Sequence, residues 1–349
     1  MWGPQTTAVL VLAVVLAVGA IVGTLAAWSR VRGPGPVRVL QRVGLVLLCQ
    51  VTAVAVAGAA INRLDGFFVT WTDVAGLLKD VGGTVPTAGP SETNVRAVIN
   101  GSQFNWSGGL WRAHLKGAAS GVTGDVLVWT PPGYDPHRAG GYRVLLALNG
   151  YPGTPVSVIN GLDLNGALTT GVTAGKIPPT LIVTATTNVD GQNWDCADAP
   201  GGPRVTTWLM HDVVNVVRQS FDVAPGRWTT IGMSTGGYCA VRLALTDPGQ
   251  VGAAISIAGE NAPDSPALAR QANDLSTLAK AGTQPPVSLF LAASRQDGTT
   301  AADAHALAAA AGPGVTTTLH LKDTGGHSWT VWAAMAAPGL DWLGAHEPS

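Results

Sequence analysis

Residues 227–248 read RWTTIGMSTGGYCAVRLALTDP and contain the turn Gly232-Met233-Ser234-Thr235-Gly236. Residues 227–231 are rich in β-branched and aromatic side chains, which is typical of a short strand. After the turn, apolar residues recur at helical spacing until Asp247-Pro248 ends the run. A serine between a strand and a helix takes a strained backbone conformation that requires small neighbours, and glycines flank it here. The stretch therefore predicts an α/β fold in which Ser234 is a catalytic nucleophile.

Short apolar segments alternate with helical or loop segments from Trp111 to the C-terminus. The strand candidates are 125–129, 142–148, 180–185, 228–231, 253–257, 287–292 and 315–321. Such alternation predicts one α/β domain with a mostly parallel central sheet, and roughly 235 residues suit a single catalytic domain. We expect this domain to occupy residues 111–349.

A serine hydroxyl is a weak nucleophile near neutral pH, so it needs a base and an acid that orients the base. In folds with this turn the acid follows the second strand after the nucleophile and the base follows the last strand. These positions hold Asp297 and His327. Glu260 and Asp264, which follow the preceding strand, stay open as alternative acids. The other histidines considered are interpreted as structural or surface residues: His114, His305, His320 and His346.

The catalytic oxyanion needs two N–H donors, and one is expected from the start of the helix after Ser234. The second should come from the loop Asn149-Gly150-Tyr151-Pro152-Gly153, which follows an apolar strand candidate. Because Pro152 has no N–H, the predicted donors are the backbone amides of Tyr151 and Thr235. The alternative interpretation of the loop is an ordinary Gly-Pro turn.

Two apolar segments near the N-terminus, Thr6 to Trp28 and Val43 to Ile61, are each long enough to cross a bilayer of roughly 30 Å. Four arginines and no acidic residue lie between them: Arg30, Arg32, Arg38 and Arg42. The positive-inside rule predicts that this loop is cytoplasmic and that the chain after Ile61 is outside. We expect a two-helix anchor at 1–62 and a juxtamembrane linker at 63–110. A cleaved signal peptide is the alternative for the first segment, although the usual basic N-terminal region is missing and the apolar run is longer than is usual there.

Charge and cysteine content bear on possible partners, metal sites and disulfides. The formal net charge is -1, which does not indicate a nucleic-acid partner, and no zinc-ligand spacing occurs, so we expect no metal and no cofactor. Cys49 falls within the second apolar segment. Cys196 and Cys239 both fall in the part expected outside, where disulfides persist, and are predicted to pair. The alternative is that Cys239 simply faces the core.

The chain resembles the esterase D and mycolyltransferase-like α/β-hydrolases, in particular membrane-anchored actinobacterial members. The motifs that carry the resemblance are VWTPPGY at 128–134, LNGYPG at 148–153, GMSTGG at 232–237 and GHSWTVW at 326–332. The resemblance implies an α/β-hydrolase sheet, Ser234 as nucleophile, His327 as base and Asp297 at the acid position. It also implies acyl-ester chemistry. Asn149 departs from the pattern, since His or Asp is usual there.

These features together predict a membrane-anchored serine esterase that acts on acyl esters outside the cell, with envelope lipids or acylated sugars as plausible substrates. Acyl transfer to an envelope acceptor is the alternative reaction, because the same triad performs both. A catalytically inactive envelope scaffold is the alternative of another class.

Overall fold

The structure is a computed structural model that describes residues 3–4, 6–65, 71 and 104–346. Most of the predicted juxtamembrane linker at 63–110 falls on residues 66–70 and 72–103, which lie outside the described residues. The N-terminal helices and the α/β domain are therefore described separately.

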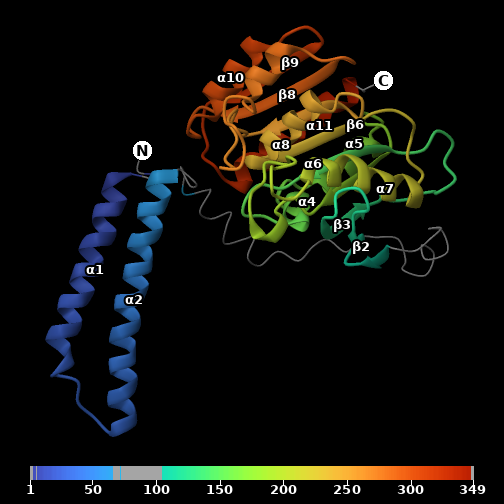
Figure 1. Ribbon diagram of the computed structural model, residues 1–349. Helices are drawn as coiled ribbons and strands as arrows, with labels where there is room; N and C mark the ends of the chain where they lie inside the picture. The colour runs from blue at the N-terminus through green and yellow to red at the C-terminus, as the bar shows by residue number, and fades with distance from the viewer. Residues whose placement is uncertain (1–2, 5, 66–70, 72–103, 347–349) are drawn as a thin grey trace. The chain divides into compact units, whose positions relative to one another are not determined.

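The N-terminal part is a hairpin of two long helices, α1 (Thr7–Trp28) and α2 (Gly35–Asp65) (Figure 1). Both are long and apolar enough to span a membrane. Their contact includes Thr24, whose Oγ1 donates to the Leu45 carbonyl at 3.4 Å and lies 3.2 Å from the Cys49 sulfur. This hydroxyl, which lies between two apolar helices, is therefore satisfied by the neighbouring helix.

The α/β domain is built on one nine-stranded sheet with the order β1-β2-β3-β5-β4-β6-β7-β8-β9. The strands are β1 (Asn105–Ser107), β2 (Leu110–Lys116), β3 (Thr123–Trp129), β4 (Arg143–Leu148), β5 (Thr180–Ala185), β6 (Trp228–Met233), β7 (Val251–Ile257), β8 (Val287–Ser294) and β9 (Val315–Lys322). From β5 to β9 in this order all neighbours are parallel, whereas β1, β2 and β3 add an antiparallel edge that meets β5. The predicted α/β fold with a mostly parallel sheet is confirmed.

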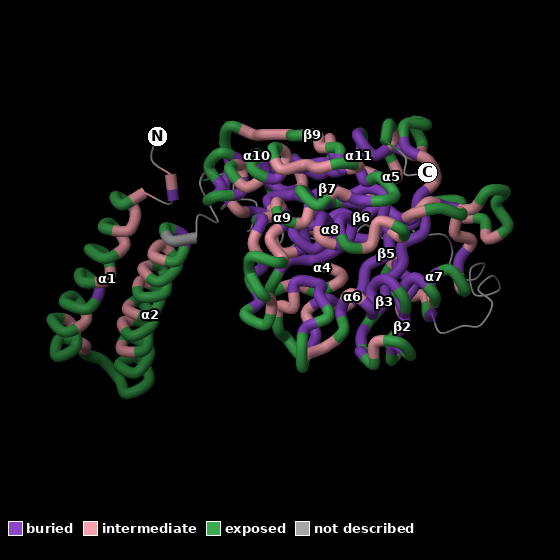
Figure 2. The backbone as a smooth tube through the Cα atoms, turned by 45° about the horizontal axis from the view of Figure 1, so that its top comes forward, coloured by how far each residue is buried: buried purple, intermediate pink, exposed green. Residues whose placement is uncertain are grey.

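Helices cover both faces of this sheet, and each face has its own apolar core. One core includes side chains from α4 (Pro155–Gly161), α5 (Leu164–Thr173) and α11 (Trp329–Ala345). The other includes side chains from α6 (Val205–Thr207), the π-helix η2 (Trp208–Val213), α7 (Val214–Ser220), α8 (Thr235–Thr246), α9 (Leu275–Ala281) and α10 (Thr300–Ala310). Figure 2 shows the central strands as buried, which explains why they are continuous apolar runs in the sequence.

All seven predicted strands correspond to strands of the sheet, from β3 to β9. The sheet also contains β1 and β2, so it begins at Asn105, a few residues before the expected domain start at Trp111. In β1 the burial alternates over only three residues, and such a short segment has too little periodicity to be recognised in the sequence.

Candidate active site

Ser234 lies in the tight turn between β6 and α8, as the sequence predicted. Its backbone has φ 55° and ψ -128°, a conformation that a residue with a side chain rarely adopts. The Ser234 N–H donates to the carbonyl of Ile257, at the end of β7, at 2.9 Å. Its side chain is partly exposed, while most of the neighbouring residues of β6 and α8 are buried. Strain of this kind is typical of a functional turn because the surrounding structure must hold it in place.

The glycines around Ser234 are required by close packing. A Cβ on Gly232 would lie 2.1 Å from the Gly236 carbonyl oxygen, and a Cβ on Gly236 would lie 2.2 Å from the Leu148 carbonyl oxygen. At Gly237 the added atom would be 2.8 Å from the Ser256 hydroxyl. The first two contacts are with backbone atoms that cannot rotate away, so the sharp turn depends on these glycines.

The loop after β4 lies directly against Ser234. A Cβ on Gly150 would be 3.3 Å from the Cβ of Ser234 and 3.1 Å from the Met233 carbonyl oxygen. Tyr151, the next residue, is 47% exposed. On the other side of Ser234, Thr235 is the first residue of α8, where backbone N–H groups have no acceptor within the helix and attract negative charge. The two predicted oxyanion donors thus belong to segments that flank Ser234.

Asp297 and His327 form a hydrogen-bonded pair. The His327 Nδ1 atom is 2.9 Å from Asp297 Oδ1 and 3.0 Å from Oδ2. The Asp297 side chain is only 4% exposed, whereas that of His327 is 19% exposed. A bond from Nδ1–H to the carboxylate leaves Nε2 as the basic nitrogen of the ring. The structure therefore brings together the predicted base and the predicted acid, which follow β9 and β8 along the chain.

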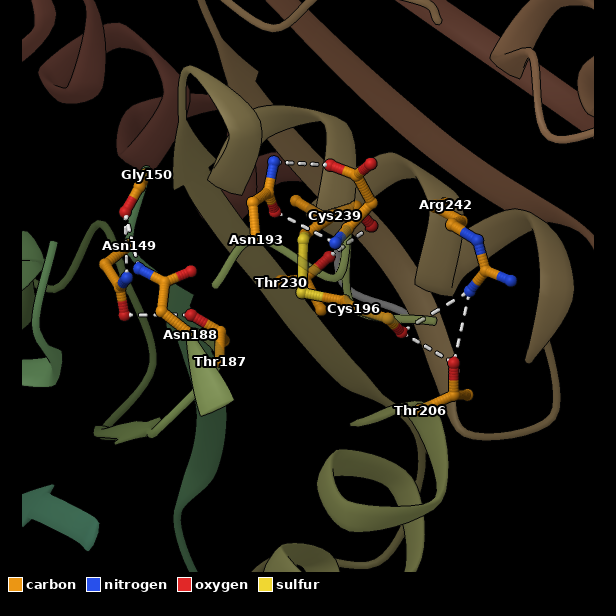
Figure 3. Close-up of a disulfide and its surroundings, with 12 residues drawn as sticks. Asn149, Gly150, Thr187, Asn188, Asn193, Cys196, Thr206, Thr230, Cys239 and Arg242 are labelled. Atoms are coloured by element: carbon orange, nitrogen blue, oxygen red, sulfur yellow. Dashed lines mark hydrogen bonds between the residues drawn. A yellow bond between two sulfur atoms is a disulfide. The ribbon is translucent and has the colours of Figure 1, made fainter. Parts of the chain in front are cut away.

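A disulfide joins Cys196, in the loop after β5, to Cys239 on α8 (Figure 3). The two Cα atoms are 5.5 Å apart, and both residues are buried. Nearby on the same helix, Arg242 donates to the Cys196 carbonyl at 3.5 Å and to the Thr206 hydroxyl at 3.2 Å. The predicted pairing is confirmed, and it anchors the loop after β5 to the helix that begins after Ser234.

Asp195, beside the disulfide, is a buried carboxyl that the sequence analysis did not single out. Burial raises the pKa of Asp195 above its usual range, although an N–H of Ser265 at 2.6 Å and the Asn193 amide at 3.0 Å oppose this effect. The Ser265 bond connects the loop after β5 to the loop after β7.

Within the part of the chain that the structure describes, no group of three or more metal-ligating side chains occurs.

Comparisons with known proteins identify the relatives of this domain. A family model described as "Putative esterase" matches residues 121–343. A protein of Corynebacterium glutamicum described as uncharacterized is 27% identical over 242 residues, which cover 63% of this chain and 56% of that protein. The chain thus spans little more than half the length of this curated relative.

Two solved structures are similar to the chain at 18% identity, a level that shows the fold alone. An S-formylglutathione hydrolase from Agrobacterium tumefaciens has a TM-score of 0.59, with 71% of this chain and 98% of that chain covered. A ferulic acid esterase has a TM-score of 0.57, with 68% of this chain and 97% of that chain covered. The expected α/β-hydrolase fold is therefore confirmed.

Proposed function

Because the chain belongs to this esterase family, we propose that it is a serine carboxylic ester hydrolase in which Ser234, His327 and Asp297 form the catalytic triad. The main support is the strained turn at Ser234, which the sterically required glycines Gly232 and Gly236 maintain. The hydrogen-bonded pair of His327 and Asp297 is the second support, because it is the base and acid that such a serine needs.

In the proposed acylation step, His327 Nε2 takes the proton from the Ser234 hydroxyl as Oγ attacks the ester carbonyl carbon. The carbonyl π electrons move to oxygen, and the backbone N–H groups of Thr235 and Tyr151 bind the resulting oxyanion. Asp297 accepts the Nδ1–H hydrogen bond, which holds the ring in the required tautomer and stabilises the imidazolium. Collapse of the intermediate expels the alcohol, which takes its proton from Nε2.

In the proposed deacylation step, a water molecule gives a proton to His327 Nε2 and attacks the acyl-enzyme carbonyl. The second intermediate collapses to a free carboxylic acid, and the departing Ser234 Oγ takes the proton from His327 Nε2. An acceptor alcohol in place of water would give acyl transfer. Hydrolysis is proposed because the matched family is an esterase family.

The two N-terminal helices support a membrane-bound esterase with its α/β domain outside the cell. The arginines between the helices favour a cytoplasmic connecting loop. In that location, acyl esters of the cell envelope are the proposed substrate class, such as lipids or acylated sugars. The disulfide is consistent with an oxidising compartment.

A fluorophosphonate probe tests the nucleophile, because it reacts with an activated serine hydroxyl. The wild-type chain should be labelled and should hydrolyse 4-nitrophenyl esters, whereas Ser234→Ala should do neither. Ser107→Ala, at an exposed serine of β1, is the matched control and should behave as wild type. Equal labelling of the Ser234→Ala variant would show that the nucleophile is another residue.

The reaction products distinguish hydrolysis from acyl transfer and from an inactive scaffold. Hydrolysis predicts one equivalent of free acid for each alcohol released, with or without an acceptor alcohol. If acid appears only in the absence of an acceptor and a new ester forms in its presence, the enzyme is an acyltransferase. A wild-type chain that folds but neither reacts with the probe nor releases acid would be an inactive scaffold.

A further inference from the structure

The peptide group that joins Gly150 to Tyr151 contains the proposed oxyanion donor, the Tyr151 N–H, and the Gly150 carbonyl. For the N–H to bind the oxyanion, this carbonyl must point away from it. Among the residues that the structure describes, the cis peptide bonds are Tyr151-Pro152 and Gln284-Pro285, so the Gly150–Tyr151 bond is trans. In a trans peptide the C=O and the N–H point in opposite directions. Whatever fixes the Gly150 carbonyl therefore also fixes the direction of the Tyr151 N–H.

Two side-chain amides bind this carbonyl (Figure 3). Asn149 Nδ2 donates to the Gly150 oxygen at 2.9 Å, and Asn188 Nδ2 donates to the same oxygen at 3.2 Å. Asn188 also donates to the Gly153 carbonyl at 3.0 Å. One amide from the loop after β5 thus closes the turn of the loop after β4 from Gly150 to Gly153.

The orientation of the Asn149 amide is set by a third residue. Thr187 Oγ1 donates to Asn149 Oδ1 at 3.2 Å, which leaves the Nδ2 group for the Gly150 carbonyl. Asn149 and Thr187 are both buried, with 2% and 4% of their surface exposed. Buried polar groups of this kind keep their hydrogen bonds because losing one is costly.

We propose that Asn188 and Asn149 are positioning residues of the oxyanion hole, an inference that rests on the proposed esterase function. Their two donors hold the Gly150 oxygen away from Ser234 and so direct the Tyr151 N–H toward the oxyanion. Hydrogen bonds to the carbonyl also polarise the peptide group, which makes its N–H a stronger donor. Without these donors the peptide can turn over and present its oxygen to the developing negative charge.

Two substitutions of Asn188 test the proposal on the full chain. Asn188→Asp keeps the shape but loses the donor at neutral pH, and Asn188→Leu loses it without adding charge. For both we expect kcat for a 4-nitrophenyl ester to fall by about 10²–10³, as for loss of one oxyanion donor, with KM changed by less than about threefold. The rate constant for fluorophosphonate labelling should fall in parallel, because the phosphonyl oxygen occupies the same hole.

Asn160→Asp is the matched control, since it makes the same amide-to-acid change at an exposed residue of α4. It should keep the wild-type kcat. The pH profile of kcat/KM should keep its midpoint in Asn188→Leu, because the His327–Asp297 pair is unchanged. A loss caused by general unfolding would instead lower the active fraction without changing the labelling rate constant of the remaining enzyme.

Thr187→Val serves as a second variant, which replaces the hydroxyl group with a methyl group of similar size and leaves both asparagines in place. It should lower kcat several-fold by releasing the Asn149 amide. Wild-type values of kcat for Asn188→Leu and Thr187→Val would overturn the proposal, and so would losses confined to KM. A wild-type enzyme without esterase activity or labelling would instead refute the proposed function.

Discussion

At the scale of single residues, the turn at Ser234 depends on the absence of side chains around it. Gly236→Ala would place a Cβ 2.2 Å from the Leu148 carbonyl oxygen, and backbone in the centre of the sheet cannot move away. We expect a loss of about 3 kcal/mol or more in the free energy of unfolding, measured by urea denaturation of the detergent-solubilised chain. Gly249→Ala, where a Cβ would meet nothing within 4 Å, should stay within about 0.5 kcal/mol of wild type. Equal urea midpoints for the two variants would contradict the steric requirement.

The proposed triad makes a second prediction at this scale. His327→Ala should lower kcat almost as much as Ser234→Ala, on the order of 10⁶-fold, because triad members act as a unit. Asp297→Asn should cost on the order of 10⁴-fold by favouring the wrong tautomer of His327. The alternative acid from the sequence analysis provides the comparison: Glu260→Gln should remain near wild type. A near-normal kcat for Asp297→Asn with a large loss for Glu260→Gln would reverse the assignment.

At the scale of elements, the disulfide connects the loop after β5 to α8. The linked cysteines are 43 residues apart, and the chain-entropy model gives a stabilisation of about 4 kcal/mol for a loop of that length. The Cys196→Ser/Cys239→Ser double variant should lose about that much in the free energy of unfolding. It should keep kcat within about tenfold, because no catalytic group is removed. Cys49→Ser in α2 is the control, and an unchanged stability of the double variant would contradict the prediction.

Asp212, at the end of the π-helix η2, supports the turn between β2 and β3. Its two carboxylate oxygens accept from the backbone N–H groups of Ala119 and Ser120, both at 2.9 Å. Burial alone would raise the pKa of Asp212, but the hydrogen bonds from Ser120 and Ala119 hold it below its usual range. A lowered folded-state pKa stabilises the fold fully above the unfolded pKa of about 4, and this contribution disappears as pH falls through the folded pKa.

The corresponding test compares wild type with Asp212→Asn at several pH values. At pH 7 the variant should be less stable by about 1–3 kcal/mol, since an amide cannot accept from both N–H groups. Below pH 4 the difference between the two chains should shrink as the wild-type carboxylate takes up a proton. Urea unfolding at pH 7, 4 and 3 measures the stability difference between wild type and Asp212→Asn. A stability difference that does not change with pH would contradict the role of the carboxylate charge.

Local patterns in the sequence predicted much of this architecture, whereas contacts between distant loops were not predictable. The strands from β3 to β9 are apolar runs bounded by turn residues, and the turn at Ser234 has a strand on one side and a helix on the other. Asn149 belongs to the loop predicted to supply an oxyanion donor and departs from the family pattern, but neither its hydrogen bond to Gly150 nor that of Asn188 is predictable from the sequence. Their shared acceptor, the Gly150 carbonyl, is 38 residues from Asn188 along the chain. No periodicity or motif spacing in the sequence predicts a contact between residues so far apart.

At the scale of the whole molecule, the two apolar helices form the proposed membrane anchor, which would determine where the proposed esterase meets its substrate. Gly19 and Gly23 of α1 do not form a close contact with α2, because a Cβ at either position would meet nothing within 4 Å. The bond from Thr24 to Leu45 connects the helices instead. Composition identified the helices correctly, but the face that each one uses depends on rotation about its axis, which a nearly uniform apolar sequence does not encode.

The orientation of the hairpin is the last prediction. Four arginines without an acidic residue lie between the apolar segments, and moving such a loop across the membrane is unfavourable. In a Cys49→Ala background, a membrane-impermeant maleimide should label Ser107→Cys in intact cells, because β1 belongs to the α/β domain. It should label Ser29→Cys, at the end of α1, only after permeabilisation. The reverse pattern would place Ser234 in the cytoplasm and would exclude envelope esters as the substrates.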